Sequence, residues 1–365
     1  MKCTINDIAV VISESIPNPA ESGYDIFVGL EHYDSGEVKV TRYGSTENLV
    51  TAVKVFKKGD ILLARRNVYL KRAGLVDFDG VTSGDSIVLR VKQDLSNLGI
   101  SSAAVQKYLP FVLNTEEFWN YAEKYSDGTM SKRLSPKTLL QYEFEIPEDV
   151  ESKNELLWAA FDAKESYRAM IRATDEMVKS QFIELVKSSN PEKKTLASIC
   201  TRGPQNGFYR KGAEIDGTIP IVKMSQLFGF ESMGDVCHFD LVSMTEDELK
   251  RFSLTENDLL FGRRSLVPEG AGKCRRAGKV EQTVVFESSI LRVSIDPDIC
   301  YPRFIQAWTE SPEGEQAISE LRAGTSVVGI TGTGLSKVIV PVPTKDIQYM
   351  YIRVAEQADK SKYLN

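Results

Sequence analysis

The sequence predicts an α+β fold. Two pseudo-symmetric, mainly β domains are joined by a long helix able to form a coiled coil, and a short helix ends the chain. Three observations predict this arrangement. A short apolar run followed by an arginine pair and further basic residues occurs twice, in residues 57–72 and 255–276. Short strand-like runs surround each copy. Between the copies, residues 151–190 contain neither Gly nor Pro.

The composition allows two folded domains of ordinary size. The chain has 365 residues, of which 42% are hydrophobic and 26% are charged. This length divides into two domains of roughly 100–200 residues, each with its own core. The net charge of −6 excludes a generally basic protein. It leaves nucleic-acid binding open, because binding follows local patches of charge rather than the total.

Residues 1–150 form the first predicted domain. Its strand signals are short runs of β-branched or aromatic residues bounded by Gly, Asp or Pro. They are residues 24–30, 60–64, 86–91 and 141–147. One or two helices are expected late in this domain, near residues 111–125.

Residues 151–190 are predicted to form a central helix. Apolar or small side chains recur there at a spacing of three or four, as in the seam of a coiled coil. They are Leu157, Ala160, Tyr167, Ile171, Thr174, Val178 and Leu185. About 36 residues give roughly 54 Å of helix at 1.5 Å per residue. The helix is either an ordinary interdomain connection or a rigid spacer between two equivalent domains, and the repeat favours the spacer.

Residues 191–345 form the second predicted domain, and residues 346–365 form a short distal helix. The strand signals are residues 218–224, 258–262, 283–293 and 337–343, with one or two helices near residues 304–321. The halves align at an offset of about 196, which matches Gly128 with Gly324 and Pro147 with Pro343. Each half is therefore a β domain followed by a helical segment.

Both halves carry a dense basic segment at the same place in the repeat. Residues 54–72 hold seven Lys or Arg against Asp60 alone, and residues 263–279 hold six against Glu269 alone. Such patches bind DNA phosphates, and arginine also reads guanine in the major groove. A solvated charged loop is the alternative, and it explains one patch better than two matched ones. The predicted DNA-contacting residues are Arg65, Arg66, Tyr69, Lys71, Arg72, Lys132 and Arg133 in the first half, and Arg263, Arg264, Lys273, Arg275 and Arg276 in the second.

The two halves differ after a matched Gly-Thr pair. Lys132 and Arg133 follow this pair in the first half, whereas the corresponding residues of the second half carry no charge. Such an asymmetry is expected of two domains that read different base sequences.

Recognisable patterns for catalysis and metal binding are missing from the sequence. There is no Asp/Asn/Ser-Pro-Pro-aromatic tetrapeptide for methylating an amino group, no P-loop and no nucleophile elbow. The five Cys and two His have no ligand spacing, so neither a metal nor a cofactor is expected in this chain. The scattered, odd set of cysteines predicts reduced thiols and a cytoplasmic location. The N-terminal apolar run is too short for a signal peptide, and no membrane association is expected.

With these features the chain resembles the specificity subunit of type I restriction-modification systems over essentially its whole length. In the first half the resemblance is carried by "YDIFVGLEHYDSGEVKVTRYG" and "YSDGTMSKRLSPKTLLQYEFEIP". In the second half it is carried by "LTENDLLFGRR" and "AGTSVVGITGTGLSKVIVPVP", and the central helix contains "EMVKSQFIELV". Their order and doubling carry more weight than any single motif.

The resemblance implies two target recognition domains, each reading one half of a split double-stranded DNA site. It implies helices that act as a ruler and dock two methyltransferase subunits, which bring S-adenosylmethionine, and a motor-nuclease subunit as a further partner. The family ends in a second long helix that pairs with the central one. Here only residues 346–365 follow, so we expect a truncated distal helix and a central helix whose apolar stripe pairs with another subunit.

The leading interpretation is a non-catalytic reader of DNA sequence that directs methylation and restriction by partner subunits. Two alternatives stay open. The first is a catalytic methyltransferase or nuclease with fused recognition domains, against which the missing motifs argue. The second is an interaction scaffold without a DNA role, which lacks the steep salt dependence of phosphate binding.

Overall fold

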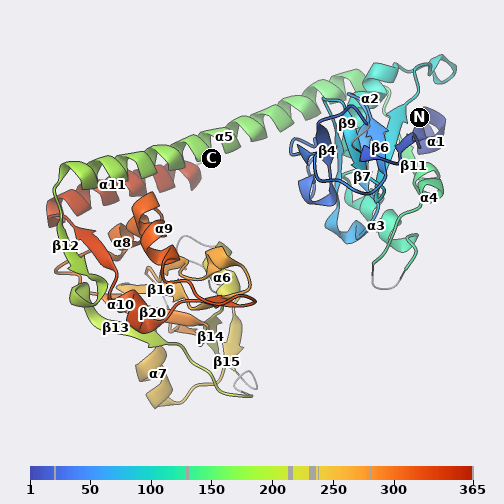
Figure 1. The fold of residues 1–365 in the computed structure, drawn as a ribbon. Coiled ribbons are helices and arrows are strands. Elements are labelled where there is room, and N and C mark those ends of the chain that lie inside the picture. The colour runs from blue at the N-terminus through green and yellow to red at the C-terminus, as the bar shows by residue number, and fades with distance from the viewer. Residues whose placement is uncertain are drawn as a thin grey trace. The chain divides into compact units, whose positions relative to one another are not determined.

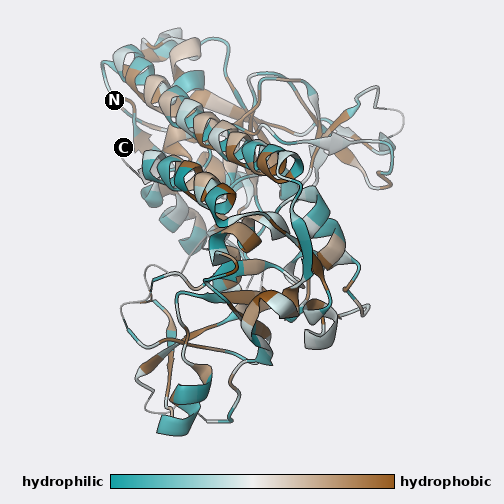
Figure 2. Ribbon diagram, turned by 90° about the vertical axis from the view of Figure 1, so that its left-hand side faces the viewer, coloured by the Kyte–Doolittle hydropathy of each residue, from teal (hydrophilic) through white to brown (hydrophobic). Residues whose placement is uncertain are grey.

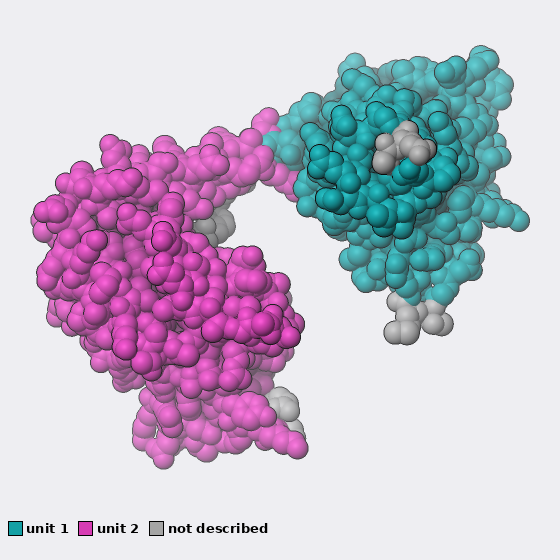
Figure 3. All heavy atoms as spheres, viewed as in Figure 1, with its two compact units in different colours: residues 1–165 teal, residues 166–365 magenta. Residues whose placement is uncertain are grey.

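The protein is described by a computed structural model that covers residues 1–19, 22–128, 131–212, 217–229, 236, 238–279 and 282–363. Contacts divide the chain into two compact units, Met1–Glu165 and Ser166–Asn365 (Figure 3). The α+β fold class is confirmed, with a long helix between two strand-rich regions and a helix at the C-terminus (Figure 1).

The first unit consists of short strands interrupted by helices (Figure 1). Its strands are β1 (Lys2–Thr4), β2 (Ala9–Ile12), β3 (Ser15–Ile16), β4 (Ile26–Val28), β5 (Gly44–Ser45), β6 (Val53–Phe56), β7 (Ile61–Ala64), β8 (Ala73–Leu75), β9 (Gly80–Ser83), β10 (Ser86–Val91) and β11 (Glu143–Glu145). Its helices are α1 (Ile5–Ile8), α2 (Ser102–Val112), α3 (Glu116–Lys124) and α4 (Pro136–Leu140), with 3-10 turns η2 (Leu30–His32), η3 (Val68–Leu70) and η4 (Ser96–Leu98). Helix α5 (Val150–Ser188) begins in this unit and continues into the second.

Two sheets and a small strand pair build the first unit. One sheet has the order β2-β10-β7-β8, the other has the order β3-β6-β9-β4-β5, and β1 pairs with β11. The central strand β7 is buried on both faces. Ile61 and Leu63 belong to the core that the helices cover, whereas Leu62 and Ala64 belong to a second core on the other face. Alternation of side chains along a strand therefore explains its unbroken apolar run.

The second unit has its own set of strands and helices. Its strands are β12 (Glu192–Thr195), β13 (Cys200–Asn206), β14 (Ile219–Val222), β15 (Asp240–Val242), β16 (Asp258–Gly262), β17 (Arg264–Ser265), β18 (Cys274–Arg276), β19 (Val285–Phe286), β20 (Ile290–Ile295), β21 (Val328–Gly329) and β22 (Ile339–Val342). Its helices are α6 (Met224–Gly229), α7 (Glu246–Phe252), α8 (Pro302–Thr309), α9 (Pro312–Ser319), α10 (Gly332–Ser336) and α11 (Lys345–Tyr363), with 3-10 turns η5 (Leu196–Ile199) and η6 (Pro268–Gly270).

The topology of the second unit repeats that of the first. Its main sheet has the order β13-β20-β16-β18, which matches β2-β10-β7-β8 position by position. Strand β12 pairs with β22 as β1 pairs with β11. Each unit also contains a parallel pair, β4 with β9 and β14 with β19. The sequence repeat is therefore a repeat of strand order.

Both acidic turns before the central strands are buried. Asp60 is 1% exposed, accepts the N–H of Lys57 at 2.8 Å and pairs with Arg90 at 2.6 Å. Asp258 is also 1% exposed and accepts the N–H of Thr255 at 2.7 Å. A buried carboxylate needs such partners. Because Asp60 is buried and pairs with Arg90, it does not neutralise the exposed basic residues near it in the sequence.

One or two helices were expected late in each domain, and the structure has two in each. Thr115 separates α2 from α3 and accepts the N–H of Phe118 at 3.2 Å. Ser311 separates α8 from α9 and accepts the N–H of Gly314 at 3.2 Å. A side-chain oxygen in this position starts a new helix by satisfying a free backbone N–H. The two caps lie 196 positions apart, which is the offset of the repeat.

Helix α5 confirms the predicted central helix and is anchored at its start by residues that the seam pattern omitted. Asn154 is 4% exposed and donates its side-chain amide to the carbonyl of Ala104 at 2.8 Å. Trp158 donates its indole N–H to the carbonyl of Lys107 at 3.1 Å. Ala160, which the seam included, is exposed.

The last turns of α5 pack against α11 within the second unit (Figures 1 and 2). Phe182 and Val186 of α5 lie in one apolar core with Tyr351, Ile352 and Ala355 of α11. Figure 2 shows hydrophobic positions recurring between hydrophilic ones along both helices. The expectation that the stripe of the central helix pairs with another subunit is wrong for this end of α5, because α11 covers it.

Candidate nucleic-acid interface

An arginine pair follows the central strand in each unit, β7 in the first and β16 in the second. The backbone N–H of Arg65 donates to the carbonyl of Asp85 at 2.9 Å. The backbone N–H of Arg263 donates to the carbonyl of Ser289 at 2.7 Å. Asp85 and Ser289 each precede the strand paired with that central strand, β10 and β20. The same backbone contact therefore fixes both arginine pairs at the end of a buried strand.

A loop late in each unit pairs with the second arginine. Arg66 faces Arg133 across an isolated antiparallel bridge. Arg264, in β17, faces Gly329, in β21. The structure therefore joins residues 65–66 to residues 132–133, which the sequence offered as two separate basic pairs.

The same two hydrogen bonds close this loop in both units. Asp127 and Arg133 exchange backbone hydrogen bonds of 3.0 and 2.8 Å. Ala323 and Gly329 exchange backbone hydrogen bonds of 3.0 and 2.9 Å. Residues 323–327 are exposed. Residues 129 and 130 of the other loop, which include the Thr of the predicted Gly-Thr match, lie outside the described residues.

Asp85 links the two arginines in the first unit. Its carboxylate lies 3.7 Å from the guanidinium of Arg66 and 3.5 Å from that of Arg133. The Nε of Arg66 also donates to the hydroxyl of Ser131 at 3.0 Å, and Ser131 donates to Asn67 at 3.0 Å. The side chains of Arg66 and Arg133 are 44% and 49% exposed. They are therefore oriented by neighbours while part of each faces solvent.

Lys132 points toward a different neighbour. Its ammonium donates to the carbonyl of Glu123 at 3.1 Å and lies 3.7 Å from the carboxylate of that residue. Its backbone carbonyl accepts the N–H of Asn67 at 2.9 Å, which fixes the loop against the arginine segment.

The arginine pair of the second unit lines a hollow of about 840 Å³. Arg263 donates one Nη to the carbonyl of Ser288 at 3.2 Å, and Arg264 is exposed. Lys337 and the hydroxyl-bearing residues Thr331 and Thr333 line the same hollow. This surface offers positive charge and hydroxyl groups at one place.

The other predicted contact residues of the first segment, Tyr69, Lys71 and Arg72, lie in turn η3 or directly after it. Tyr69 is 59% exposed. Lys71 forms an ion pair with Glu116 at 2.6 Å. Arg72 donates to the carbonyl of Leu30 at 2.8 Å, and burial lowers the pKa of its guanidinium. Tyr69 thus presents its ring to solvent, whereas Arg72 is partly withdrawn.

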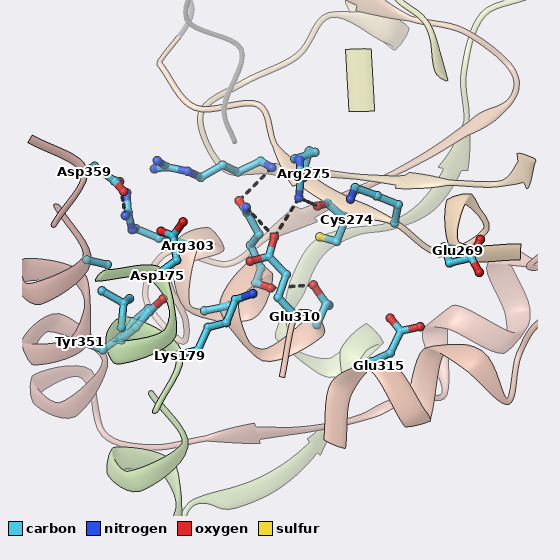
Figure 4. Close-up of a pocket in the computed structure, with 18 residues that line it drawn as sticks. Asp175, Lys179, Glu269, Cys274, Arg275, Arg303, Glu310, Glu315, Tyr351 and Asp359 are labelled. Carbon is cyan, nitrogen blue, oxygen red and sulfur yellow. Dashed lines mark hydrogen bonds and ion pairs between the residues drawn. The ribbon is translucent and has the colours of Figure 1, made fainter. Parts of the chain in front are cut away.

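The second basic segment is divided between two places. Lys273, Arg275 and Arg276 lie on or beside β18 and line a different hollow, of about 500 Å³, next to α5, α8 and α11 (Figure 4). The side chain of Arg275 is 14% exposed and pairs with Glu310 at 2.8 Å. Burial lowers the pKa of Lys273, and repulsion from Arg275 lowers it further. These three residues do not line the hollow of Arg263 and Arg264, although the carbonyl of Lys273 accepts the N–H of Gly262, next to Arg263, at 2.9 Å.

Basic and acidic side chains line this second hollow in equal numbers, and some of them form ion pairs. Arg303 of α8 pairs with Asp359 of α11, as Figure 4 shows beside the Arg275–Glu310 pair. Its basic residues are Lys179, Lys273, Arg275, Arg276 and Arg303, and its acidic residues are Asp175, Glu269, Glu310, Glu315 and Asp359. Equal numbers of opposite charges give no electrostatic attraction for a polyanion. We therefore interpret this hollow as the place where β18 meets the helices of the unit, not as a DNA-binding surface.

Comparison with known proteins finds similarity to restriction-modification proteins. No family model matches it. The type I restriction enzyme EcoKI specificity subunit of Escherichia coli (strain K12) is 27% identical over 156 residues. The match covers 42% of this chain and 33% of that relative. The chain therefore spans about one third of the length of this curated relative.

A solved structure extends the likeness to nearly the whole chain. The crystal structure of a type I restriction-modification system S subunit from M. genitalium has a TM-score of 0.53 and 12% identity, and covers 99% of this chain and 90% of its own. The chain has the fold of a type I specificity subunit. A chain from a structure of type I R-M complex assembly and conformational transition has 14% identity and a TM-score of 0.48, over 99% of this chain and 91% of its own.

Three residues of the candidate interface, Asp85, Ser131 and Lys337, were not predicted from the sequence. Asp85 stands in an ordinary turn signal, Gly84-Asp85, which gives no sign of its two arginine partners. Ser131 and Lys337 are common surface residues without a local pattern. The repeat offset was the one signal available, because it aligns residues 131–133 with residues 327–329.

Other features of the specificity-subunit fold bear on the remaining expectations. No helix within the described residues is long and apolar enough to cross a membrane. Those same residues hold no group of three or more His, Cys, Asp or Glu side chains placed to bind a metal. Cys3, Cys200, Cys274 and Cys300 are free thiols, and Cys237 lies outside the described part of the chain.

Proposed function

We propose that this chain is the non-catalytic DNA-recognition subunit of a type I restriction-modification complex. Each unit reads one half of a bipartite double-stranded site, and partner subunits carry out methylation and restriction. The observation that carries this proposal is the matched frame of the two units. One set of backbone contacts presents Arg66 in the first unit and Arg264 in the second beside a loop closed in the same way.

The chemistry of this frame suits DNA. A guanidinium binds phosphate oxygens and also donates two parallel hydrogen bonds to guanine in the major groove. The frame holds Arg65, Arg66 and Arg133 in one unit and Arg263, Arg264 and Lys337 in the other. These six residues are the DNA contacts that the structure supports best. Tyr69 is a further candidate, because it follows Arg66 by three residues and its ring is exposed.

The partners follow from the same proposal. Two methyltransferase subunits bring S-adenosylmethionine, and a motor-nuclease subunit joins them for restriction. Helix α5 serves as the spacer between the half-sites, since 39 residues give about 58 Å of helix at 1.5 Å per residue. The fold of a specificity subunit supports this assembly.

Mapping of methylated bases tests the proposal in the cell. Genomic DNA from cells with and without the gene is sequenced for base methylation. The proposal requires a bipartite motif that is methylated only when the gene is present. Exchange of residues 1–150 or 191–345 for the matching part of another specificity subunit must change one half of that motif and leave the other half. A methylation pattern that does not depend on the gene contradicts the proposal.

Two binding measurements separate the alternatives. A DNA reader loses affinity steeply as salt rises, because phosphate contacts release counterions. An interaction scaffold shows no such DNA binding. A catalytic methyltransferase binds S-adenosylmethionine as the isolated chain, whereas a recognition subunit binds it only together with its partners.

A further inference from the structure

Each unit holds its exposed loop in the same structural frame. Gly128 and Gly324, at the start of the loops, have φ angles of 97° and 111°. A side chain at either position would be strained, because only glycine adopts such angles readily. Leu134 and Ile330, after the loops, are 0% and 3% exposed. The loops therefore enter and leave the two units in the same way.

The residue after each buried anchor completes the frame. Ser135 accepts the N–H of Thr138 at 3.0 Å and starts α4. Thr331 accepts the N–H of Gly334 at 3.0 Å and starts α10. A hydroxyl in this position fixes the first turn of the helix. Both ends of each loop are thus determined by packing and capping.

The side chains carried by this common frame differ in kind. The first unit has Ser131, Lys132 and Arg133, and the second has residues 327–329, which are Val-Val-Gly. The side chain of Arg133 is 49% exposed, and Val327 is 48% exposed. Two domains that recognise different base pairs need the same backbone frame but different side chains on it, and these two loops meet that requirement.

The residue at the position of Asp85 also differs between the two units, as does the residue at that of Arg133. The carboxylate of Asp85 lies 3.5 Å from Arg133 in the first unit. In the second unit Ser289 occupies the corresponding backbone position, and Gly329 replaces the arginine. The carboxylate is therefore absent where the loop arginine is absent, although Arg66, which Asp85 also contacts at 3.7 Å, keeps its counterpart Arg264. Of the two arginine contacts of Asp85, only the one with Arg133 disappears together with its arginine, so orienting Arg133 is the role that the comparison of the two units supports.

The carboxylate also distinguishes between two uses of Arg133. A phosphate contact gains from unneutralised positive charge, and a carboxylate at this distance repels the phosphate. A guanine edge is neutral and offers two acceptors to an oriented guanidinium. An arginine held by a carboxylate is therefore suited to reading a base rather than to gripping the backbone.

We propose that residues 131–133 and 327–329 are the specificity-determining segments of the two units. Arg133 reads a guanine, with Asp85 as its positioning residue, and Val327 contacts an apolar feature of a base edge, the methyl group of thymine. This inference rests on the proposed function and goes beyond it by naming the positions that select the bases. It predicts that a half-site can be altered through three residues without exchange of the domain.

Selection from a randomised duplex library tests the proposal. The full-length chain is incubated with duplexes of random central sequence, and the retained DNA is sequenced. The parent is expected to select two half-sites. The variant S131V/K132V/R133G is expected to lose its preference for guanine at one position of one half-site, by a factor of about 10 or more. The variant V327S/V328K is expected to alter the other half alone; Gly329 is kept, because a Cβ there would lie 2.9 Å from the carbonyl oxygen of Arg263. Unchanged half-sites in both variants overturn the proposal.

Asp85 is tested separately as a positioning residue. In D85N, discrimination at the guanine falls while affinity for a non-specific duplex rises, because one negative charge is lost near the DNA. D85E keeps the charge and is expected to retain more of the discrimination. A structural role alone would lower both specific and non-specific binding. Loss of both in D85N therefore overturns the role given to Asp85.

Controls separate failure of folding and of the proposed function from failure of this inference. Lys92, just beyond the far end of β10, donates to backbone carbonyls in α1, and K92Q removes one positive charge away from the loop. It must leave both half-sites unchanged. R133K keeps the positive charge but removes the planar guanidinium, so it is expected to lose the preference for guanine while keeping its affinity for non-specific DNA. If R133K, folded by circular dichroism, selects the parental half-sites, Arg133 does not read the base. If the parent selects no sequence, the proposed function is wrong and the inference falls with it.

Discussion

The ring of Phe182 in α5 lies 4.9 Å from the ring of Tyr351 in α11, measured between centroids, at an interplanar angle of 73°. An edge-to-face pair of this kind is favourable beyond its burial alone. Phe182 also contacts Phe304 of α8, with 5.0 Å between centroids. Phe182 therefore joins the long helix to two other helices of the second unit.

Truncation of this residue is expected to destabilise the second unit. Phe182 is 3% exposed, and replacement of a buried Phe by Ala costs about 3–5 kcal/mol. Scanning calorimetry of F182A should lower the unfolding temperature of the second unit. M170A is the matched control, because Met170 of the same helix is 53% exposed and its loss is expected to cost no more than about 0.5 kcal/mol. Equal effects of the two variants would show that α5 does not pack on the unit as described.

The arginine pairs are expected to contribute to DNA binding in both units. R65A/R66A and R263A/R264A each remove two positive charges from one frame, and direct base contacts are worth about 1–3 kcal/mol each. Fluorescence anisotropy with a duplex that contains the recognised site should therefore give a higher Kd for both double variants. Circular dichroism checks that the fold is kept. Parental affinity in both variants would mean that DNA binds elsewhere on the protein.

The described thiols are expected to react slowly in the folded chain. Burial raises the pKa of Cys3 to about 11 and that of Cys200 and Cys300 to about 12, and it also raises that of Cys274. The reactive thiolate is therefore scarce up to pH of about 9, whereas an unfolded thiol has a pKa of about 8.5.

A C237S variant, which removes the one thiol outside the described residues, allows this to be measured with a thiol-specific chromophore. At pH of about 8, labelling should be slow until denaturant is added, and then four thiols should react. Rapid labelling of the native variant would contradict the burial of these side chains.

The length of α5 is expected to set the spacing of the recognised half-sites. Four residues inserted after Ala173 add about 6 Å and slightly more than one helical turn, so the facing of the second unit is nearly kept. The non-specific spacer of the methylated motif should then lengthen by one or two base pairs, with unchanged half-sites. Two inserted residues turn the second unit by about 200°, at about 100° per residue, and should abolish bipartite recognition. An unaltered spacer after the four-residue insertion would rule out the ruler.

Local pattern was sufficient for the elements whose formation depends on nearby residues. The run without Gly or Pro predicted α5, and apolar runs ended by turn residues predicted β7, β10 and β16. The offset of 196 aligned Gly128 with Gly324, and the structure gives both a positive φ. Periodicity and turn chemistry act within a few residues, so they can be read without the fold.

The sequence by itself thus determined the two-domain repeat, the central helix and the presence of a basic segment in each half. Only the tertiary structure decided which charges stand together. A bridge between distant segments joins Arg66 to Arg133, and burial of Asp60 removes it from the surface charge. The hairpin from β16 to β18 carries Arg275 away from Arg264 and pairs it with Glu310. A count of charge along the chain treats neighbours in sequence as neighbours in space, whereas strand pairing and burial set the actual distances.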